Sequence, residues 1–246
     1  MSSPRASVII AAGGAGRRFV EARSGGAADA ASEAKVFVAL AGRPVLAYVL
    51  GAFARVPAVA EAVVAVPDDR VAWARDTFGE ALSDGRPLVF VAGGNRRTDS
   101  VERALAATNP ETDLVAIHDA ARPLIRSRVI QEAMGVAMEQ GAAVVGRPVD
   151  HTVKRVNDDA RVIETVPRRH LWLAQTPQVF RREVITQAYA RRASVLGPVT
   201  DDAQLVEALG RTVCMVEGDG ANLKITTPED LRTCEALLAA GWPFEA

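Results

Sequence analysis

The chain has little of what binds nucleic acid or crosses a membrane. Its 29 Lys and Arg residues face 30 Asp and Glu residues, for a formal net charge of −1, whereas proteins that coat nucleic acid need a basic surplus. Arg43 and Arg55 interrupt the longest apolar region before it could span a bilayer, and no apolar core of signal-peptide type follows the N-terminal residues. We therefore predict a cytoplasmic protein with no nucleic-acid and no membrane partner.

Cysteine and lysine are also scarce. The 2 cysteines, Cys214 and Cys234, are too few and too widely spaced for a disulfide framework or a zinc site, and we expect both to be small apolar core residues. Lysines occur at only three positions, Lys35, Lys154 and Lys224. In a chain that otherwise uses arginine, a retained lysine is a candidate for a place that needs a compact ammonium group, with chance as the alternative.

The remaining composition predicts one large α/β domain over residues 1–246. A hydrophobic content of 49% is ample for a sizeable core. Short apolar segments alternate with helix-like segments, which predicts βαβ units and a three-layer, Rossmann-like fold with a mainly parallel sheet and helices on both faces. The predicted strands are 8–11, 62–66, 88–91, 114–117, 142–145 and 212–216; the predicted helices are 44–55, 69–78, 100–107, 128–140, 182–191, 201–209 and one opened by Thr227 and Pro228.

Residues 149–173 depart from this alternation. Segments 152–156 and 161–166 alternate apolar and charged residues around a turn at 157–159, a pattern typical of a β-hairpin. Because an isolated two-stranded ribbon is marginal in water, we predict that 149–173 is an arm that lies against a second subunit.

The first predicted strand runs into a glycine-rich loop. Gly13, Gly14 and Gly16 let backbone N–H groups approach a ligand, and the arginines Arg17 and Arg18 attract negative charge, which together indicate a bound phosphate. A dinucleotide fingerprint would need a third glycine where Phe19 stands, and a Walker loop would need Gly-Lys-Ser/Thr, so both known phosphate loops are excluded. Residues 21–33, rich in Ala, Gly and Ser, are predicted to form a mobile loop beside this motif.

Three more loops carry unusual polar residues. In 92–102, glycines precede Asp99 and Glu102, which have capping-box spacing; this loop suits a base or a phosphate, or is an ordinary strand-to-helix turn. Asp119 ends a buried strand, where a carboxylate can hold Mg²⁺ and Arg122 can neutralise charge; the alternative is a salt-bridged loop pair. We interpret His118 as a hydrogen-bonded structural residue. The glycine-rich loop 218–228 is interpreted as one that brings Lys224 to a ligand, with a solvated loop as the alternative.

These loops suggest phosphoryl or nucleotidyl transfer, in which catalysis consists mostly of positioning and charge stabilisation. No Ser/His or Cys/His pair is evident. A phosphate monoester acceptor would need no general base, because its second pKa is near 6 and its oxygen is already ionised at pH 7.

The motifs resemble those of the 2-C-methyl-D-erythritol 4-phosphate cytidylyltransferases over nearly the whole chain. The matching segments are 11–18, Lys35, 98–101, 118–123, 150–155, 175–178, 200–202 and 221–226. The resemblance implies a nucleotidyltransferase fold, a homodimer, and transfer of CMP from CTP to the sugar-alcohol phosphate with release of pyrophosphate.

The resemblance also implies roles for individual residues. Arg18 and Lys35 would stabilise charge on the α-phosphate, and Asp119 would bind Mg²⁺. CTP would be bound by Ala11, Ala12, Gly13, Gly14, Gly16, Gly94, Asn95, Ser100, Asp119 and Ala120. The acceptor would be positioned by Arg122, Thr152, Arg168 and Lys224, with Thr152 and Arg168 on the arm that reaches into the partner subunit; Arg168 and Lys224 also count as catalytic candidates.

The chain departs from the family pattern at several points. The glycine loop is one residue longer, which leaves Arg17 and Arg18 as candidates for one role, and about ten residues are added before Lys35, which follows Ala34 instead of a proline. Ala221 stands where the family often has an acidic residue. Two other functions stay open: a ribitol-5-phosphate cytidylyltransferase, against which Ala121 in place of valine argues, and a non-catalytic nucleotide-binding module.

Overall fold

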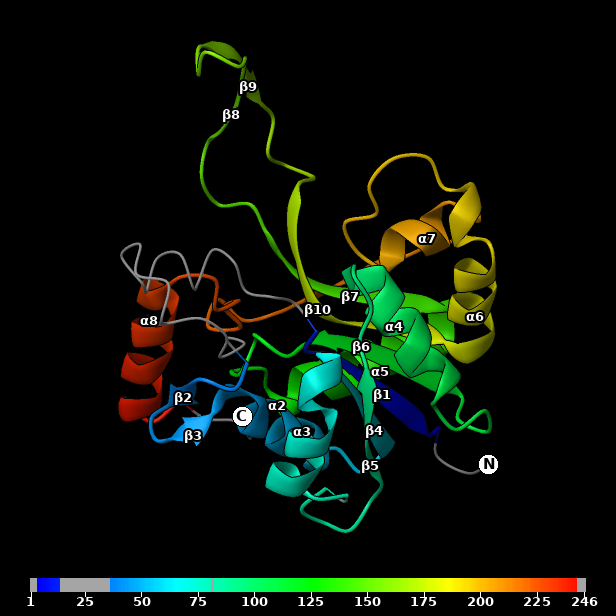
Figure 1. Cartoon of the computed structure of the whole chain (residues 1–246). Helices are drawn as coiled ribbons and strands as arrows, with labels where there is room; N and C mark the ends of the chain where they lie inside the picture. Colours follow the sequence, from blue (N-terminus) through cyan, green and yellow to red (C-terminus); the bar gives the residue numbers. More distant parts are fainter. Residues whose placement is uncertain (1–3, 14–35, 81, 243–246) are drawn as a thin grey trace.

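The computed structural model describes residues 4–13, 36–80 and 82–242, and a seven-stranded sheet forms its centre (Figure 1). The strand order is β11-β7-β10-β6-β1-β4-β5, and every strand except β10 runs parallel to the others. The mainly parallel sheet is therefore confirmed. Its strands are β1 (Ala6–Ala11), β4 (Val59–Val66), β5 (Leu88–Ala92), β6 (Leu114–Asp119), β7 (Ala142–Pro148), β10 (Trp172–Arg181) and β11 (Cys214–Glu217).

The central strands are mostly apolar on both faces because helices cover both sides of the sheet. Val8 and Ile10 belong to one hydrophobic cluster and Ile9, between them, to the other, as the alternation of side chains along a strand requires. The first cluster packs against α2 (Val45–Ala54), α3 (Val71–Phe78) and α5 (Ser127–Gln140). The second packs against α4 (Arg97–Ala106), α6 (Arg182–Ala190) and α7 (Ala203–Glu207) (Figure 1).

A third, smaller hydrophobic cluster packs the last helix against β2 (Ala39–Leu40) and the start of α2. Helix α8 (Pro228–Ala239) begins as predicted: Thr227 is its N-cap, the Asp230 backbone N–H donates to Thr227 Oγ1 at 3.3 Å, and Pro228 occupies the first turn. Cys234 on α8 is fully buried, as predicted, whereas Cys214 on β11 is only half-buried; both thiols are free. The remaining short elements are β3 (Arg43–Pro44), which pairs with β2, η2 (Asp68–Arg70), which precedes α3, and η3 (Arg192–Ser194), which follows α6.

Two local predictions need correction. Helix α4 begins at Arg97, three residues before the predicted start, and the Arg96 backbone N–H donates to Asp99 Oδ2 at 3.1 Å. Asp99 therefore lies at the third helical position, and it forms a capping box with Arg96 instead of with Glu102. Strand β10 lies in a region for which no central strand was predicted, and it inserts antiparallel between β6 and β7.

The predicted hairpin is present. Strands β8 (Val153–Val156) and β9 (Val162–Val166) form a separate two-stranded sheet, which projects away from the seven-stranded sheet (Figure 1). Large apolar side chains along the arm are exposed: Val162 by 61%, Ile163 by 63% and Leu173 by 60%.

Candidate active site

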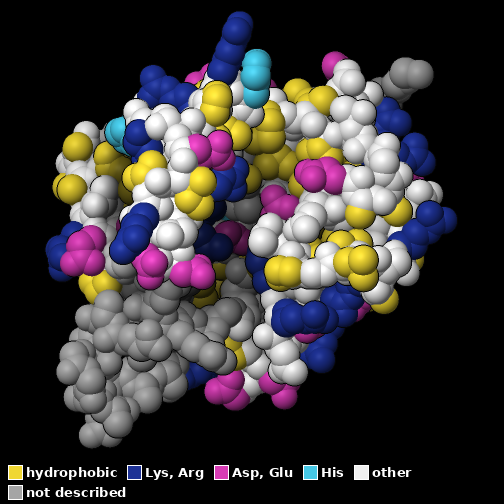
Figure 2. Space-filling model, turned by 90° about the horizontal axis from the view of Figure 1, so that it is seen from above, with side chains coloured by type: hydrophobic (Ala, Val, Ile, Leu, Met, Phe, Trp, Pro, Cys, Tyr) yellow, Lys and Arg dark blue, Asp and Glu magenta, His cyan; other side chains and the backbone are white. Residues whose placement is uncertain are grey.

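The site lies where β1 and β6 end side by side. Ala11 pairs with Asp119 in the parallel register, so the loops that follow the two strands leave the sheet at the same edge. The face shown in Figure 2 is hollowed near its centre, where Lys or Arg side chains lie beside Asp or Glu side chains. Two cavities open at this edge, and they meet at three shared residues, Arg97, Asp119 and Lys224.

The first cavity, of about 410 Å³, is bounded by the end of β1 up to Gly13 and by the loop before α4. Backbone packing there is tight: the Gly94 N–H donates to Ser100 Oγ at 3.0 Å, and a Cβ on Gly94 would lie 2.4 Å from Asp99 Cβ. The predicted CTP-binding residues that line this cavity are Ala11, Ala12, Gly13, Gly94, Asn95, Ser100 and Asp119. Ala120 is fully buried and its N–H donates to Ala11 O at 3.2 Å, while its neighbour Ala121 lines the cavity.

The second cavity, of about 260 Å³, lies beside the first and is polar. Besides the three shared residues, it is lined by Arg122, Ala174, Gln175, Thr176, Gln178, Thr200 and Asp201. Four of these side chains come from β10, so the antiparallel strand supplies one wall of this cavity. A polar cavity with basic side chains at its junction with the first suits a small phosphorylated acceptor.

Asp119 is the centre of the charge arrangement. Asp119 is 7% exposed; Oδ1 accepts from Arg97 Nε at 2.9 Å and Oδ2 from Lys224 Nζ at 2.7 Å, with Arg122 Nε 3.8 Å from Oδ2. Burial opposes ionisation, but the positive charges of Arg97, Lys224 and Arg122 outweigh it and hold the pKa of Asp119 well below its usual range. The carboxylate is therefore ionised at neutral pH and in contact with three cations.

Hydrogen bonds to two other segments hold the loop that carries Lys224. Ile225 N donates to Ala121 O at 2.8 Å, and the buried Asn222 Nδ2 donates to Thr176 O at 2.9 Å. Arg122 completes the connection by donating to Asn222 O at 2.9 Å. The Lys224 side chain, 40% exposed, thus places its ammonium group at the junction while it is still open to a ligand.

His118 is a structural residue, as predicted. Its side chain is fully buried, Nε2 lies 3.1 Å from Arg122 O and Nδ1 lies 3.1 Å from Thr176 Oγ1. Burial lowers the pKa of His118 to about 4. A neutral imidazole with both nitrogens occupied is not placed to act as a base toward either cavity.

Several predicted site residues lie elsewhere or outside the described part of the chain. Thr152 and Arg168 are on the exposed arm and line neither cavity of their own chain; Arg168 donates to Asp150 O. Lys154, also on the arm, donates to Thr165 Oγ1 at 2.6 Å. The predictions for Gly14, Gly16, Arg17, Arg18, Lys35 and the 21–33 segment fall outside the described residues.

Sequence reasoning did not single out Arg97. Of the adjacent arginines that open α4, Arg96 is exposed and paired with Asp99, whereas Arg97 turns inward and bonds both Asp119 and Asp202. The sequence does contain an acidic pair, Asp201 and Asp202, that could bind an inward-facing arginine. These residues are more than 100 positions from Arg97, however, and sequence order alone does not show that the two segments are in contact.

The chain matches the family model described as "IspD: 2-C-methyl-D-erythritol 4-phosphate cytidylyltransferase" over residues 6–240. It belongs to this family. Two curated members are similar over nearly their full lengths: the 2-C-methyl-D-erythritol 4-phosphate cytidylyltransferase of Pelotomaculum thermopropionicum is 40% identical over 96% of this chain and 94% of that protein, and the one of Rhodopirellula baltica is 41% identical over 94% of both.

Solved structures of this cytidylyltransferase family share the fold. The 2-C-methyl-D-erythritol 4-phosphate cytidylyltransferase of Thermus thermophilus superposes with a TM-score of 0.73 at 34% identity, covering 96% of this chain and 99% of that one. The 4-diphosphocytidyl-2C-methyl-D-erythritol synthase of Anaerococcus prevotii superposes with a TM-score of 0.81 at 27% identity, covering 96% of both chains. The predicted fold and the predicted enzyme class, a cytidylyltransferase, are thereby confirmed.

Proposed function

We propose that this cytidylyltransferase transfers CMP from CTP to 2-C-methyl-D-erythritol 4-phosphate, giving 4-diphosphocytidyl-2-C-methyl-D-erythritol and pyrophosphate, in non-mevalonate isoprenoid precursor biosynthesis. The observation that carries this proposal is the junction of two cavities at Arg97, Asp119 and Lys224. The tight glycine-lined cavity suits the nucleotide, and the polar cavity suits the acceptor. Their junction is where the reacting phosphates would meet.

The chemistry needs positioning more than a base. An oxygen of the acceptor phosphate attacks the α-phosphorus of CTP, the bond from that phosphorus to the β-bridging oxygen breaks, and pyrophosphate leaves with the electron pair. The attacking oxygen is already ionised at pH 7. Lys224 and Arg97 lie at the junction where negative charge gathers in the transition state, and Arg18 and Lys35 are proposed to add positive charge at the α-phosphate.

We include Mg²⁺ in this proposal, with Asp119 as its protein ligand. Among residues 4–13, 36–80 and 82–242, no three His, Cys, Asp or Glu side chains are grouped to hold a metal. A single carboxylate suits Mg²⁺ that arrives with a nucleotide, since this ion completes its octahedron with phosphate oxygens and water and neutralises phosphate charge. CTP affinity should therefore rise with added Mg²⁺ in the wild type and respond much less in Asp119→Asn, as titration calorimetry would show.

A homodimer through the 149–173 arm is part of the same proposal. The exposed apolar side chains of the arm would be buried against a second copy, and Thr152 and Arg168 would then reach the partner's acceptor cavity. Ile163→Asp, which places a charge among them, should raise the monomer fraction in analytical ultracentrifugation. An unchanged dimer would move the interface elsewhere.

The compartment is proposed to be the cytoplasm. Both cysteines are free thiols, in keeping with a reducing compartment. Among residues 4–13, 36–80 and 82–242, none of the helices could span a bilayer.

The deciding experiment is a coupled pyrophosphate-release assay with two acceptors. With CTP and Mg²⁺, 2-C-methyl-D-erythritol 4-phosphate should be turned over faster than ribitol 5-phosphate. Faster turnover of ribitol 5-phosphate would favour the ribitol enzyme, and CTP binding without pyrophosphate release on either acceptor would favour a non-catalytic module.

A further inference from the structure

Hydrogen bonds connect a tyrosine on α6 with the junction of the two cavities. The Tyr189 hydroxyl donates to Asp202 Oδ1 at 2.5 Å, and Asp202 Oδ2 accepts from Arg97 at 2.6 Å. Arg97 Nε then donates to Asp119 Oδ1 at 2.9 Å. These hydrogen bonds form one continuous line of side chains, Tyr189–Asp202–Arg97–Asp119, which runs from the second hydrophobic cluster to the site.

Asp202, the second member of this line, is completely buried. A buried carboxylate is retained only when its oxygens are paired, and here each oxygen has one partner. Its backbone is also fixed: the N–H groups of Asp202 and Ala203 both donate to Gln178 Oε1 at 3.0 Å. Asp202 is therefore a rigid anchor that the substrates themselves cannot reach.

Arg97 carries the effect of this anchor into the site. Its guanidinium is planar, so bonding one terminal nitrogen to Asp202 sets the direction in which Nε faces Asp119. Burial would lower the pKa of Arg97, but the two carboxylates outweigh burial and raise it. Arg97 thus stays charged, and it lines both cavities.

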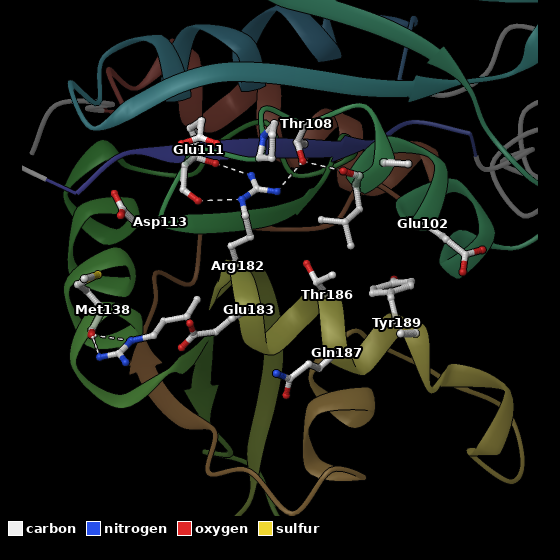
Figure 3. A pocket seen from close by; sticks show the side chains of 16 residues that line it. Glu102, Thr108, Glu111, Asp113, Met138, Arg182, Glu183, Thr186, Gln187 and Tyr189 are labelled. Atoms are coloured by element: carbon white, nitrogen blue, oxygen red, sulfur yellow. Dashed lines mark hydrogen bonds between the residues drawn. The ribbon is translucent and has the colours of Figure 1, made fainter.

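Tyr189 stands at the other end, outside both cavities. Its side chain helps to line a groove of about 1130 Å³ between α4 and α6, together with Glu102 and Thr186 (Figure 3). Burial and the nearby Asp202 carboxylate raise the pKa of its hydroxyl, so the group is a permanent donor at neutral pH. Tyr189 lines neither cavity, and its hydroxyl is connected to the site through Asp202.

We propose that Tyr189 and Asp202 are positioning residues for the transfer reaction: together they hold Arg97 in the orientation that keeps the Asp119 carboxylate in place between the two substrates. This inference rests on the function proposed above. Because a displacement of a catalytic group by a fraction of an ångström slows chemistry more than it weakens binding, loss of the Tyr189 hydroxyl should act on kcat.

The chain offers a matched pair of variants, since it has 2 tyrosines. Tyr189→Phe removes the bond to Asp202, and Tyr48→Phe, on α2, removes a bond from the hydroxyl to Leu40 O at 2.9 Å. We expect Tyr189→Phe to lower kcat about tenfold with little change in the KM for CTP, and Tyr48→Phe to leave kcat unchanged. Equal melting temperatures in the two variants would separate positioning from general stability.

A second pair of variants tests whether the effect passes through Arg97. Lysine at position 97 keeps the charge but cannot bond both carboxylates in a fixed fork. In an Arg97→Lys background, adding Tyr189→Phe should therefore lower kcat less than twofold further. An unchanged kcat in Tyr189→Phe alone, or a full tenfold loss in the Arg97→Lys background, would overturn the proposal. Wild-type protein inactive on both acceptors would instead overturn the proposed function.

Discussion

Two impaired variants should restore activity to each other if the acceptor site is shared between subunits. Lys224 lies in the body of the chain, with Nζ 2.7 Å from Asp119 Oδ2. Arg168 lies on the arm and lines neither cavity of its own chain. In the proposed dimer, an Arg168→Ala subunit and a Lys224→Ala subunit would therefore each be defective in a different half of the site.

The size of the effect follows from the contacts and the symmetry. On the proposed roles, each variant would lose one charged hydrogen-bond donor to a phosphate, a contact worth about 1.5–3 kcal/mol, so each parent should lose about 10- to 100-fold in kcat/KM for the acceptor. Random association of equal amounts gives about half mixed dimers. Each mixed dimer has one site with both side chains and one with neither, so the mixture should recover about a quarter of wild-type activity.

The assay is pyrophosphate release by mixed dimers purified through two different tags. These dimers should reach about half of wild-type activity, because one of their two sites is complete. Arg169→Ala is the matched control, since it removes the neighbouring arginine and should behave as wild type. Purified mixed dimers no more active than their parents would refute the shared site.

Three further predictions concern other parts of the site. Burial lowers the pKa of His118 to about 4 in the folded protein, so between about pH 6.5 and pH 4 the unfolded chain binds a proton that the folded protein does not. The free energy of unfolding measured in urea should therefore fall by up to about 3 kcal/mol as the pH is lowered over that range. The fall should be smaller in His118→Asn, and His151→Gln, at an exposed histidine, is the control. Gly94→Ala should raise the KM for CTP, because its Cβ would lie 2.4 Å from Asp99 Cβ, whereas Gly135→Ala, with no atom within 4 Å, should not. Lys35→Ala should lower kcat far more than it weakens CTP binding, and an unchanged kcat would remove Lys35 from the mechanism.

Much of the fold could be predicted because its strands and caps are local signals. The run from Val8 to Ala11 in β1 is apolar because helices cover both faces of the sheet, and the adjacent residues Thr227 and Pro228 mark the start of α8. Asp119 could be placed at a strand end by the same reasoning. These features depend on neighbours in the sequence, which is why periodicity and composition detect them.

Strand β10 could not be predicted, because its stability depends on distant partners. It contains Gln175, Thr176 and Gln178, polar residues that favour a loop when taken alone. In the structure all three are buried, since Thr176 Oγ1 accepts from Asp119 N and the two glutamines bond the 201–203 and 219–222 loops. Burial of polar side chains is permitted only by such partners, and these lie 23 to 57 residues away.

Arg97 shows the same limit at a single position. Two consecutive arginines open α4, and successive side chains on a helix point about 100° apart, so one of the two can face the site while the other faces solvent. Which one does so depends on where the helix begins, and the predicted start was three residues late. The structure places Arg96 outside and Arg97 inside. An error of one turn in a helix boundary therefore hid the arginine that joins Asp119 to Asp202.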